Sequence, residues 1–310
     1  MSTSRRPLES SVLACSFAKV NLGLKIVGRR RDGYHDIQTL FQTVTLHDRL
    51  RFARLRTGKI DFTCNDPRVP RNSENLIVRA AQLFRKETGL RAGVAIHLEK
   101  RIPLGAGLGG GSSNAAVTLL ALERLFGRRM GDLRRLRLAR SLGADVPFFL
   151  CGGRALGFGR GDEVVSLPDG RLATLLLACP DLPISTAHAY RWASLGLTKV
   201  RRANNMARFR LRFFEKESVF TLFENDFERV LFARYPLLRR LKRRLLSAGA
   251  TEAQMTGSGS AVFGVFSSVQ AARSAEARLR SSPSLPALQT FVVRSLPRSH
   301  YAKRILTAFE

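Results

Sequence analysis

The fold of this chain is decided by one stretch, Pro103-Leu104-Gly105-Ala106-Gly107-Leu108-Gly109-Gly110-Gly111-Ser112-Ser113. Five of these residues are glycines, whose backbone is costly to order, so the chain must turn sharply or approach a ligand closely there. An apolar segment, residues 94–98, leads into the loop, and Ser112-Ser113-Asn114 offers N-cap residues for a helix over residues 115–126. A strand, a glycine loop and a helix N-terminus together form an anion site, because free N–H groups and the helix dipole point at the bound group. The stretch therefore predicts phosphate binding, with nucleotide phosphate as the first expectation.

The spacing of the glycines separates this loop from three known phosphate loops. A Walker loop requires a lysine where this chain has Gly111. The dinucleotide pattern G-x-G-x-x-G is matched literally by Gly105, Gly107 and Gly110, but no acidic residue ends a second strand about 20 residues later. The H-R-D and D-F-G motifs of protein kinases are absent from the sequence. A flexible linker is not usually bracketed by an apolar strand and a helix, so a phosphate loop of another type is the favoured interpretation.

Length and composition are those of an ordinary globular protein. The chain has 310 residues, 45% of them hydrophobic, which is enough for two domains with cores of their own. Its apolar segments are too short to span a membrane, and the polar residues 1–11 are not typical of a signal peptide. The four cysteines lack metal-ligand spacing, and the five histidines form no ligand cluster. We therefore expect a soluble protein with reduced thiols, located in the cytoplasm.

The formal net charge of +28 is the most unusual property of the composition. A strongly basic surface is typical of nucleic-acid-binding proteins. Here the arginines are spread along the chain, and no known nucleic-acid motif accompanies them. A diffuse positive field also attracts polyphosphate substrates. We expect a small-molecule substrate, no specific nucleic-acid partner, no membrane partner, and a monomer or weak homodimer.

The first third of the chain predicts several strands and a helix. Alternating apolar residues over 12–26 predict a half-buried strand in which Lys19 and Asn21 project on the same side. Arg31-Asp32-Gly33 predicts a turn, which Tyr34 and His35 follow. Further strands are predicted over residues 36–44, 50–55 and 60–64, with a turn at His47-Asp48. Asn72-Ser73-Glu74-Asn75 predicts the start of a helix that Gly89 ends, and an arginine-rich helix is predicted over residues 130–142.

One carboxylate stands out in the segment Gly143-Ala144-Asp145-Val146-Pro147, where apolar residues and a proline flank Asp145. A charged side chain in such surroundings is not simply solvated. Asp145 is therefore either a helix cap or a chemical group, and the residues alone leave both readings open.

The strand and helix pattern restarts near residue 172. Strands are predicted over residues 173–179, 261–266 and 290–293, and helices over 186–192, 235–248 and 269–279. Residues 199–217 are polar and weakly periodic, which predicts a loop or a helix. The order is β-α-β-β-α-β in outline, which is typical of a ferredoxin-like sandwich. We predict an α+β fold with an N-terminal domain over residues 1–170 and a C-terminal domain over residues 171–310.

Three segments resemble the three sequence motifs of the GHMP kinases, which are small-molecule kinases whose ATP loop differs from the Walker type. The segments are Ser16-Phe17-Ala18-Lys19-Val20-Asn21-Leu22, the glycine loop, and Met255-Thr256-Gly257-Ser258-Gly259-Ser260, in the family's order. The resemblance implies a two-domain fold with an N-terminal α/β domain of the ribosomal-protein-S5-domain-2-like type and a C-terminal ferredoxin-like α/β sandwich. It also implies ATP as the phosphoryl donor and Mg²⁺ as the metal ion.

Five further segments resemble the GHMP kinases that act on a cytidine-diphosphate-linked methylerythritol: residues 31–35, 38–42, 74–77, 142–147 and 225–228. This resemblance implies phosphorylation of the 2-hydroxyl of the methylerythritol unit, in non-mevalonate isoprenoid biosynthesis. Two alternatives stay open. A homoserine- or mevalonate-type GHMP kinase would share the glycine loop but not Tyr34-His35. A basic nucleic-acid-binding protein would explain the charge but not the three motifs.

The resemblance further implies a role for each site residue. Asp145 is the expected base for the hydroxyl proton, and Lys19 is the cation that holds it ionised. ATP is expected on the whole loop over residues 103–113, with the adenine near Asn72, Asn75 and Leu76. The substrate is expected on Asn21, Tyr34, His35, Tyr190 and Thr256, with the cytosine between the rings of Tyr34 and Tyr190. Mg²⁺ is expected mainly on the ATP phosphates, with Ser112 and Ser113 as candidate hydroxyl contacts and no assignable glutamate.

Overall fold

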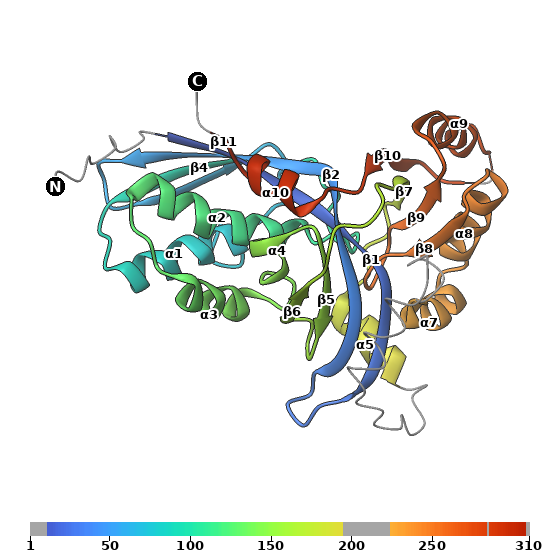
Figure 1. The fold of residues 1–310 in the computed structure, drawn as a ribbon, viewed down its shortest axis with the longest axis horizontal. Helices are drawn as coiled ribbons and strands as arrows, with labels where there is room; N and C mark the ends of the chain where they lie inside the picture. Colours follow the sequence, from blue (N-terminus) through green and yellow to red (C-terminus); the bar gives the residue numbers. More distant parts are fainter. Residues whose placement is uncertain (1–10, 195–223, 284, 308–310) are drawn as a thin grey trace.

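The computed structural model describes residues 11–194, 224–283 and 285–307 (Figure 1). Two β-sheets lie side by side, and helices pack against both of them. The α+β class predicted from the sequence is confirmed. The predicted loop or helix at residues 199–217 falls outside the described residues. Within the described ranges, no helix is both long and apolar enough to cross a membrane.

The larger sheet is built around a long hairpin of β1 (Ser11–Arg29) and β2 (His35–Leu55). Its strands follow the order β11-β1-β2-β4-β3, while β5 pairs with β2 and with β6. The hairpin also reaches the second half of the chain, because Leu24 forms a bridge with Asn225. The remaining strands are β3 (Ile60–Cys64), β4 (Gly93–Glu99), β5 (Arg154–Phe158), β6 (Glu163–Ser166) and β11 (Leu306–Thr307).

The turn predicted at His47-Asp48 is wrong, because β2 continues through both residues. His47 pairs with Phe17 and Asp48 pairs with Ser16 across the hairpin. The carboxylate of Asp48 is fully buried and accepts hydrogen bonds from the segment that precedes the glycine loop. Asp48, which resembles a surface turn residue, is thus satisfied inside the protein by partners far along the chain.

Three helices cover one face of the larger sheet: α1 (Leu76–Thr88), α2 (Gly110–Phe126) and α3 (Asp132–Leu142) (Figure 1). Helix α1 has the predicted caps. The Asn75 side chain accepts a hydrogen bond from the Ile77 N–H, and Gly89 ends the helix in the left-handed region at φ 65°. Helix α2 is buried on almost all sides, which explains its apolar sequence.

The start predicted for the helix after the glycine loop is wrong. Helix α2 begins at Gly110, and its N-cap is Gly109 in the left-handed region at φ 71°. The predicted N-cap residues Ser112-Ser113-Asn114 already lie inside the helix, and the last two are buried. Tertiary contacts of Ser113 and Asn114 thus replace the local capping role that Ser and Asn usually play.

The second sheet has the strand order β10-β7-β9-β8 and is antiparallel throughout. This order confirms the predicted ferredoxin-like sandwich. Its strands are β7 (Thr174–Pro180), β8 (Glu252–Met255), β9 (Val262–Phe266) and β10 (Leu288–Arg294). Its helices are α5 (Thr186–Ser194), α7 (Asp226–Arg234), α8 (Pro236–Ser247) and α9 (Val269–Arg280).

Alternate residues of β7 belong to two different cores. Leu176 and Ala178 pack in the core that includes buried side chains of helices α7, α8 and α9. Leu175 and Leu177 pack in the core that contains Val20 of β1. The second sheet is therefore joined to the hairpin by apolar contacts, which holds the first and third sequence motifs close together.

The last described segment returns to the larger sheet. Strand β11 pairs with β1, and helix α10 (Arg298–Arg304) packs beside it. The Tyr301 hydroxyl of α10 donates to the carbonyl of Phe149 at 2.5 Å, in the short helix α4 (Phe148–Cys151). The sequence did not predict α4, α10, β5, β6, β8 or β11. The boundary between residues 170 and 171 stays a prediction, and residues 298–307 pack against the first sheet.

Candidate active site

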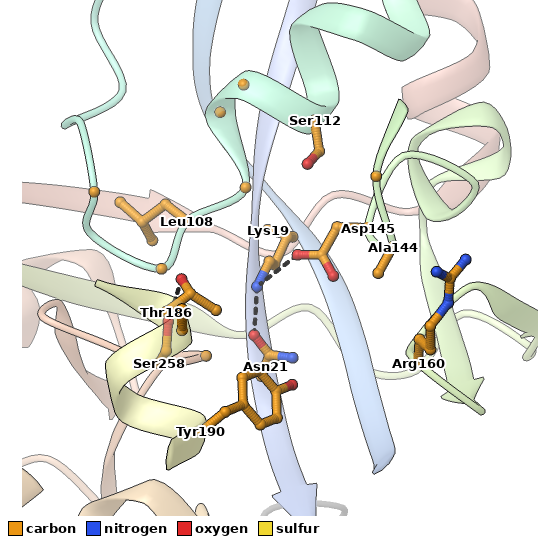
Figure 2. Close-up of a pocket in the computed structure, with 18 of the residues that line it drawn as sticks. Lys19, Asn21, Leu108, Ser112, Ala144, Asp145, Arg160, Thr186, Tyr190 and Ser258 are labelled. Carbon is orange, nitrogen blue, oxygen red and sulfur yellow. Dashed lines mark hydrogen bonds and ion pairs between the residues drawn. The ribbon is translucent and has the colours of Figure 1, made fainter. Parts of the chain in front are cut away.

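A cavity of about 1050 Å³ lies where the glycine loop meets β1, the turn after α3 and helix α5 (Figure 2). Its lining includes loop residues 103–112, Lys19 and Asn21 of β1, and Asp145 of the turn. Residues 257–259 of the third motif complete the wall. The fold thus brings together three motifs that lie far apart in the sequence.

The glycine loop is held in a conformation that only glycine adopts easily. Gly105, Gly107 and Gly109 have φ values of 65°, 74° and 71°. The backbone N–H of Lys19 donates to the Leu108 carbonyl at 3.0 Å, which ties the loop to β1. A Cβ atom on Gly107 would lie only 2.3 Å from the Thr256 carbonyl oxygen. The loop is therefore packed directly on the third motif.

Replacement of Gly107 by Ala is expected to weaken ATP binding at least tenfold and to lower the melting temperature. The new Cβ would meet the Thr256 carbonyl and would add about 1–2 kcal/mol of backbone strain. Gly89→Ala is the matched control, because Gly89 has φ 65° but open space around it. Calorimetric titration with ATP should show that only the Gly107 variant loses affinity. Equal ATP affinities in the two variants would contradict the close packing of the loop.

Lys19 and Asp145 form an ion pair on the cavity wall. Among the described residues, it is the only ion pair in which both members line the cavity. The Lys19 Nζ lies 3.3 Å from Asp145 Oδ2, and the two side chains are 4% and 30% exposed. The same ammonium donates to Asn21 Oδ1 at 2.5 Å, and the Asn21 amide donates to Thr39 Oγ1 at 2.7 Å. Figure 2 shows the Lys19 side chain pointing between Asn21 and Asp145. This arrangement can orient a hydroxyl group and accept its proton.

Positive charge dominates the cavity wall. Asp145 is the sole carboxylate among the described lining residues, whereas seven carry a cation: Lys19, Arg29, Arg79, Lys100, Arg140, Arg160 and Arg191. A cleft lined by one sign of charge concentrates ligands of the opposite sign. Sequence reasoning missed the arginines, because they come from five separate segments and no spacing marks them. Part of the unusual net charge therefore lies on the wall of this cavity.

Three aromatic residues predicted for the cytosine also line the cavity. The His35 ring stacks on Tyr190, with centroids 5.1 Å apart and planes 19° from parallel. Phe227 packs edge-on against Tyr190 at 4.9 Å. Tyr34 is 57% exposed, and the Arg160 guanidinium lies 5.1 Å from its ring centroid. The described side chains thus place His35, and not Tyr34, against Tyr190.

The surroundings of His35 and Tyr190 shift the pKa values of both side chains. Burial, assisted by the charge of Arg29, lowers the pKa of His35 below its ordinary value. His35 is therefore neutral at pH 7 and presents one N–H donor and one acceptor nitrogen. Burial, together with the negative charge of Asp145, raises the pKa of Tyr190, so its hydroxyl stays protonated.

Of the three residues predicted for the adenine pocket, Leu76 alone is part of the cavity lining. The Asn75 amide oxygen caps α1, and its nitrogen donates to the Pro70 carbonyl at 2.7 Å. Asn72 accepts a hydrogen bond from the Glu74 N–H at 3.0 Å. Both asparagines thus stabilise the start of α1, and the adenine contact assigned to them stays a prediction.

Two predicted hydroxyl residues act behind the cavity wall. Ser113 is fully buried and accepts a hydrogen bond from the Ser16 hydroxyl at 2.7 Å, so it is not available as a phosphate or metal contact. Thr256 Oγ1 accepts from the Asn21 N–H at 3.0 Å and donates to the Gly107 carbonyl at 3.2 Å. Thr256 thus links the first and second motifs, and a direct substrate contact stays a prediction. Ser112 does line the cavity.

Comparison with known proteins assigns the family. Residues 75–153 match the GHMP kinases N terminal domain, and residues 212–284 match the family described as GHMP kinases C terminal. The chain is 42% identical over 284 residues to 4-diphosphocytidyl-2-C-methyl-D-erythritol kinase of Moorella thermoacetica, covering 91% of this chain and 98% of that relative. It is 40% identical over 255 residues to the kinase of the same name from Solibacter usitatus, covering 81% and 80%.

Solved structures agree with this assignment. A crystal structure of 4-(cytidine 5'-diphospho)-2C-methyl-D-erythritol kinase has a TM-score of 0.73 at 35% identity, covering 92% of this chain and 99% of that chain. Homoserine kinase from Cytophaga hutchinsonii has a TM-score of 0.74 at 19% identity, covering 96% and 98%, which shows a shared fold alone. The chain belongs to the GHMP kinases and, within them, to the family of the 4-diphosphocytidyl-2-C-methyl-D-erythritol kinases.

Proposed function

We propose that this chain transfers the γ-phosphoryl group of ATP to the 2-hydroxyl of 4-diphosphocytidyl-2-C-methyl-D-erythritol, in non-mevalonate isoprenoid biosynthesis. The observation that carries the proposal is the ion pair of Lys19 and Asp145 beside the glycine loop. It occurs in a chain that is 35–42% identical to kinases named for this substrate. The cationic wall suits two ligands that both carry phosphate groups.

The ion pair supplies what phosphoryl transfer requires of a protein, namely positioning, a proton acceptor and charge stabilisation. The substrate oxygen forms a bond to the γ-phosphorus while the bond from that phosphorus to the β–γ bridging oxygen breaks, and ADP leaves. Asp145 accepts the hydroxyl proton. The Lys19 ammonium pairs with the carboxylate and faces the negative charge of the transferred group.

The glycine loop would bind the phosphates of ATP. Its left-handed glycines let the backbone approach a ligand closely, and the N-terminus of α2 directs its dipole toward an anion. Ser112 lies in the first turn of that helix and on the cavity wall, so its hydroxyl is available as a further donor.

The donors on the cavity wall fit Mg²⁺ bound chiefly through ATP. No group of three or more His, Cys, Asp or Glu side chains suited to a metal ion occurs among the described residues. Mg²⁺ commonly binds through one or two carboxylates together with substrate phosphates. Ser112, which lines the cavity, would contact the ion here, and when bound the ion would neutralise phosphate charge.

The cytosine would stack on the aromatic residues at the cavity wall. We infer that the base lies between Tyr34 and the pair formed by His35 and Tyr190, with the neutral His35 bonding its edge. The near-parallel stack of His35 and Tyr190 supports this placement, and Phe227 packs edge-on against Tyr190. The exposed ring of Tyr34 leaves a face that a base can cover.

Tyr190→Ala is expected to raise KM for the cytidine substrate about tenfold, because a stacked base is worth about 1–3 kcal/mol. KM for ATP should stay within twofold. His188→Ala on the same helix is the matched control, since its ring contacts Trp192 and not the cavity wall. Steady-state kinetics with each substrate varied in turn will measure both constants. An unchanged cytidine KM in the Tyr190 variant would remove this residue from the base site.

The function is tested by incubating the protein with ATP, Mg²⁺ and 4-diphosphocytidyl-2-C-methyl-D-erythritol. The expected result is one ADP per substrate molecule and a new phosphomonoester on the 2-hydroxyl, identified by phosphorus NMR. Turnover with homoserine or mevalonate alone would instead support another GHMP kinase activity. Tight, salt-dependent binding to random DNA without kinase activity would support the nucleic-acid alternative. The monomeric or weakly dimeric state and the cytoplasmic location stay predictions.

A further inference from the structure

A second pair of opposite charges lies next to the phosphate loop, and the mechanism above does not use it. The pair joins Asp48 of β2 and Lys100, which follows β4. Lys100 Nζ lies 2.9 Å from one carboxylate oxygen of Asp48 and 3.1 Å from the other. The two side chains are only 0% and 5% exposed. Such a pair is costly to bury, so its position calls for a physical reason.

Asp48 bonds each of the three residues that precede the glycine loop, Lys100, Arg101 and Ile102. Its Oδ1 accepts from the N–H groups of Arg101 and Ile102 at 2.7 and 2.8 Å. Its Oδ2 accepts from the side-chain amide of Asn114 in α2 at 3.1 Å. Pro103, the first residue of the loop, follows Ile102 directly. One carboxylate therefore joins β2, the start of the loop and the helix at the end of the loop.

The negative charge of Asp48 determines how two neighbouring groups are oriented. The Asn114 amide turns its nitrogen to the carboxylate, although its own oxygen is then buried without a hydrogen-bond partner. Lys100 lines the cavity, and its Nζ lies 3.2 Å from the position of a Cβ on Gly110, in the first turn of α2. Burial lowers the pKa of Lys100, and the charge of Asp48 opposes this shift.

We propose that Asp48 is a positioning residue for ATP, which holds both ends of the phosphate loop and keeps the Lys100 ammonium beside the first turn of α2. The proposal rests on the proposed function, because it takes the loop to be the ATP site. Stability alone does not account for the pair, since apolar residues of similar volume commonly replace a buried ion pair without loss of stability. Its location between the two ends of the loop does account for it.

The test is the affinity of the full chain for ATP with Mg²⁺, and separately for the cytidine substrate, in Asp48→Asn. The variant keeps the shape of the side chain but loses its charge and one acceptor oxygen. We expect the Kd for ATP to rise about tenfold or more, since small displacements of binding groups have effects of this size. The Kd for the cytidine substrate should stay within twofold. Because the readout is ATP binding, a lack of turnover on that substrate would overturn the proposed function but leave this test valid.

Glu123→Gln is the matched control on the same helix. Glu123 is also buried and also joins a backbone N–H and a basic side chain, those of Met130 and Arg135. It does not belong to the cavity lining. We expect a similar loss of thermal stability from this variant, with both Kd values unchanged.

A gentler substitution keeps the proposal testable if Asp48→Asn does not fold. Asn114→Ala removes one donor to Asp48 and leaves the ion pair in place. It should raise the Kd for ATP about threefold, in the same direction and without effect on the cytidine substrate. The proposal is overturned if the variants that fold bind ATP as the unmodified protein does. It is equally overturned if the two Kd values rise in parallel with loss of stability.

Discussion

Asp145→Asn is expected to reduce kcat by about 10²–10⁴-fold, which is the usual contribution of proton transfer by a positioned side chain. The amide keeps the size of the carboxylate but cannot take up the hydroxyl proton. ATP should still bind, because the loop that would hold its phosphates keeps its contacts with β1 and the third motif. Single-turnover kinetics at saturating substrates, combined with calorimetric titration of ATP, will separate the chemical step from binding.

Asp132→Asn provides the control for the loss of one negative charge. Asp132 lies at the start of α3, the helix that leads to the turn containing Asp145, and its side chain is 94% exposed. Its replacement should leave kcat within twofold. A near-normal kcat in Asp145→Asn would show that another group accepts the proton, and it would contradict the assignment of Asp145 as the base.

Lys19→Met is expected to reduce kcat by about 10²–10³-fold, the usual loss on removal of one group that stabilises transition-state charge. Methionine has a similar length to the lysine side chain, which is only 4% exposed, so the fold should persist. Two effects act together. The transferred group loses a cation, and Asp145 loses the side chain with which it forms an ion pair. The kcat should be measured together with the melting temperature.

Lys25→Met on the same strand is the control. It tests whether the loss of a lysine elsewhere on β1 also lowers kcat. Lys25 is exposed and does not belong to the cavity lining, so its replacement should leave kcat unchanged. Lys19→Arg should retain more activity than Lys19→Met because the charge remains, although the larger guanidinium would disturb Asn21. A kcat within threefold of normal in Lys19→Met would contradict the proposed charge stabilisation.

Local sequence rules predicted many elements of the fold correctly. The alternation that includes Lys19 and Asn21 indicated β1, and the caps at Asn75 and Gly89 bounded α1. These rules succeed where the nearest neighbours in the chain determine the structure. They failed at Asp48 and at Ser113, where partners far along the chain satisfy a polar side chain that local rules place in a turn or a cap.

The chemical nature of the site was predicted from the glycine loop and from the resemblance of three segments to kinase motifs. Left-handed glycines before a helix favour a phosphate, and the motifs around Lys19 and Asp145 indicate a kinase. The same rules could not find the arginines of the cavity wall, since Arg79, Arg140 and Arg160 approach the cavity from three separate segments. Nor could they show that His35, and not Tyr34, packs on Tyr190.

The amino-acid sequence alone thus predicted the phosphate loop and many of the strands and helices, because glycine conformation, strand period and helix caps are properties of neighbouring residues. Its three motifs indicated the family, and with it the main chemical groups, by resemblance. The tertiary structure decided which groups meet. The contact between Lys19 and Asp145 depends on a hairpin register that shifts beside Lys19 and on a turn that follows a distant helix. The burial of Asp48 under the loop depends on the same long-range packing. No local sequence pattern predicts these contacts, because they form only when the sheets and helices pack together.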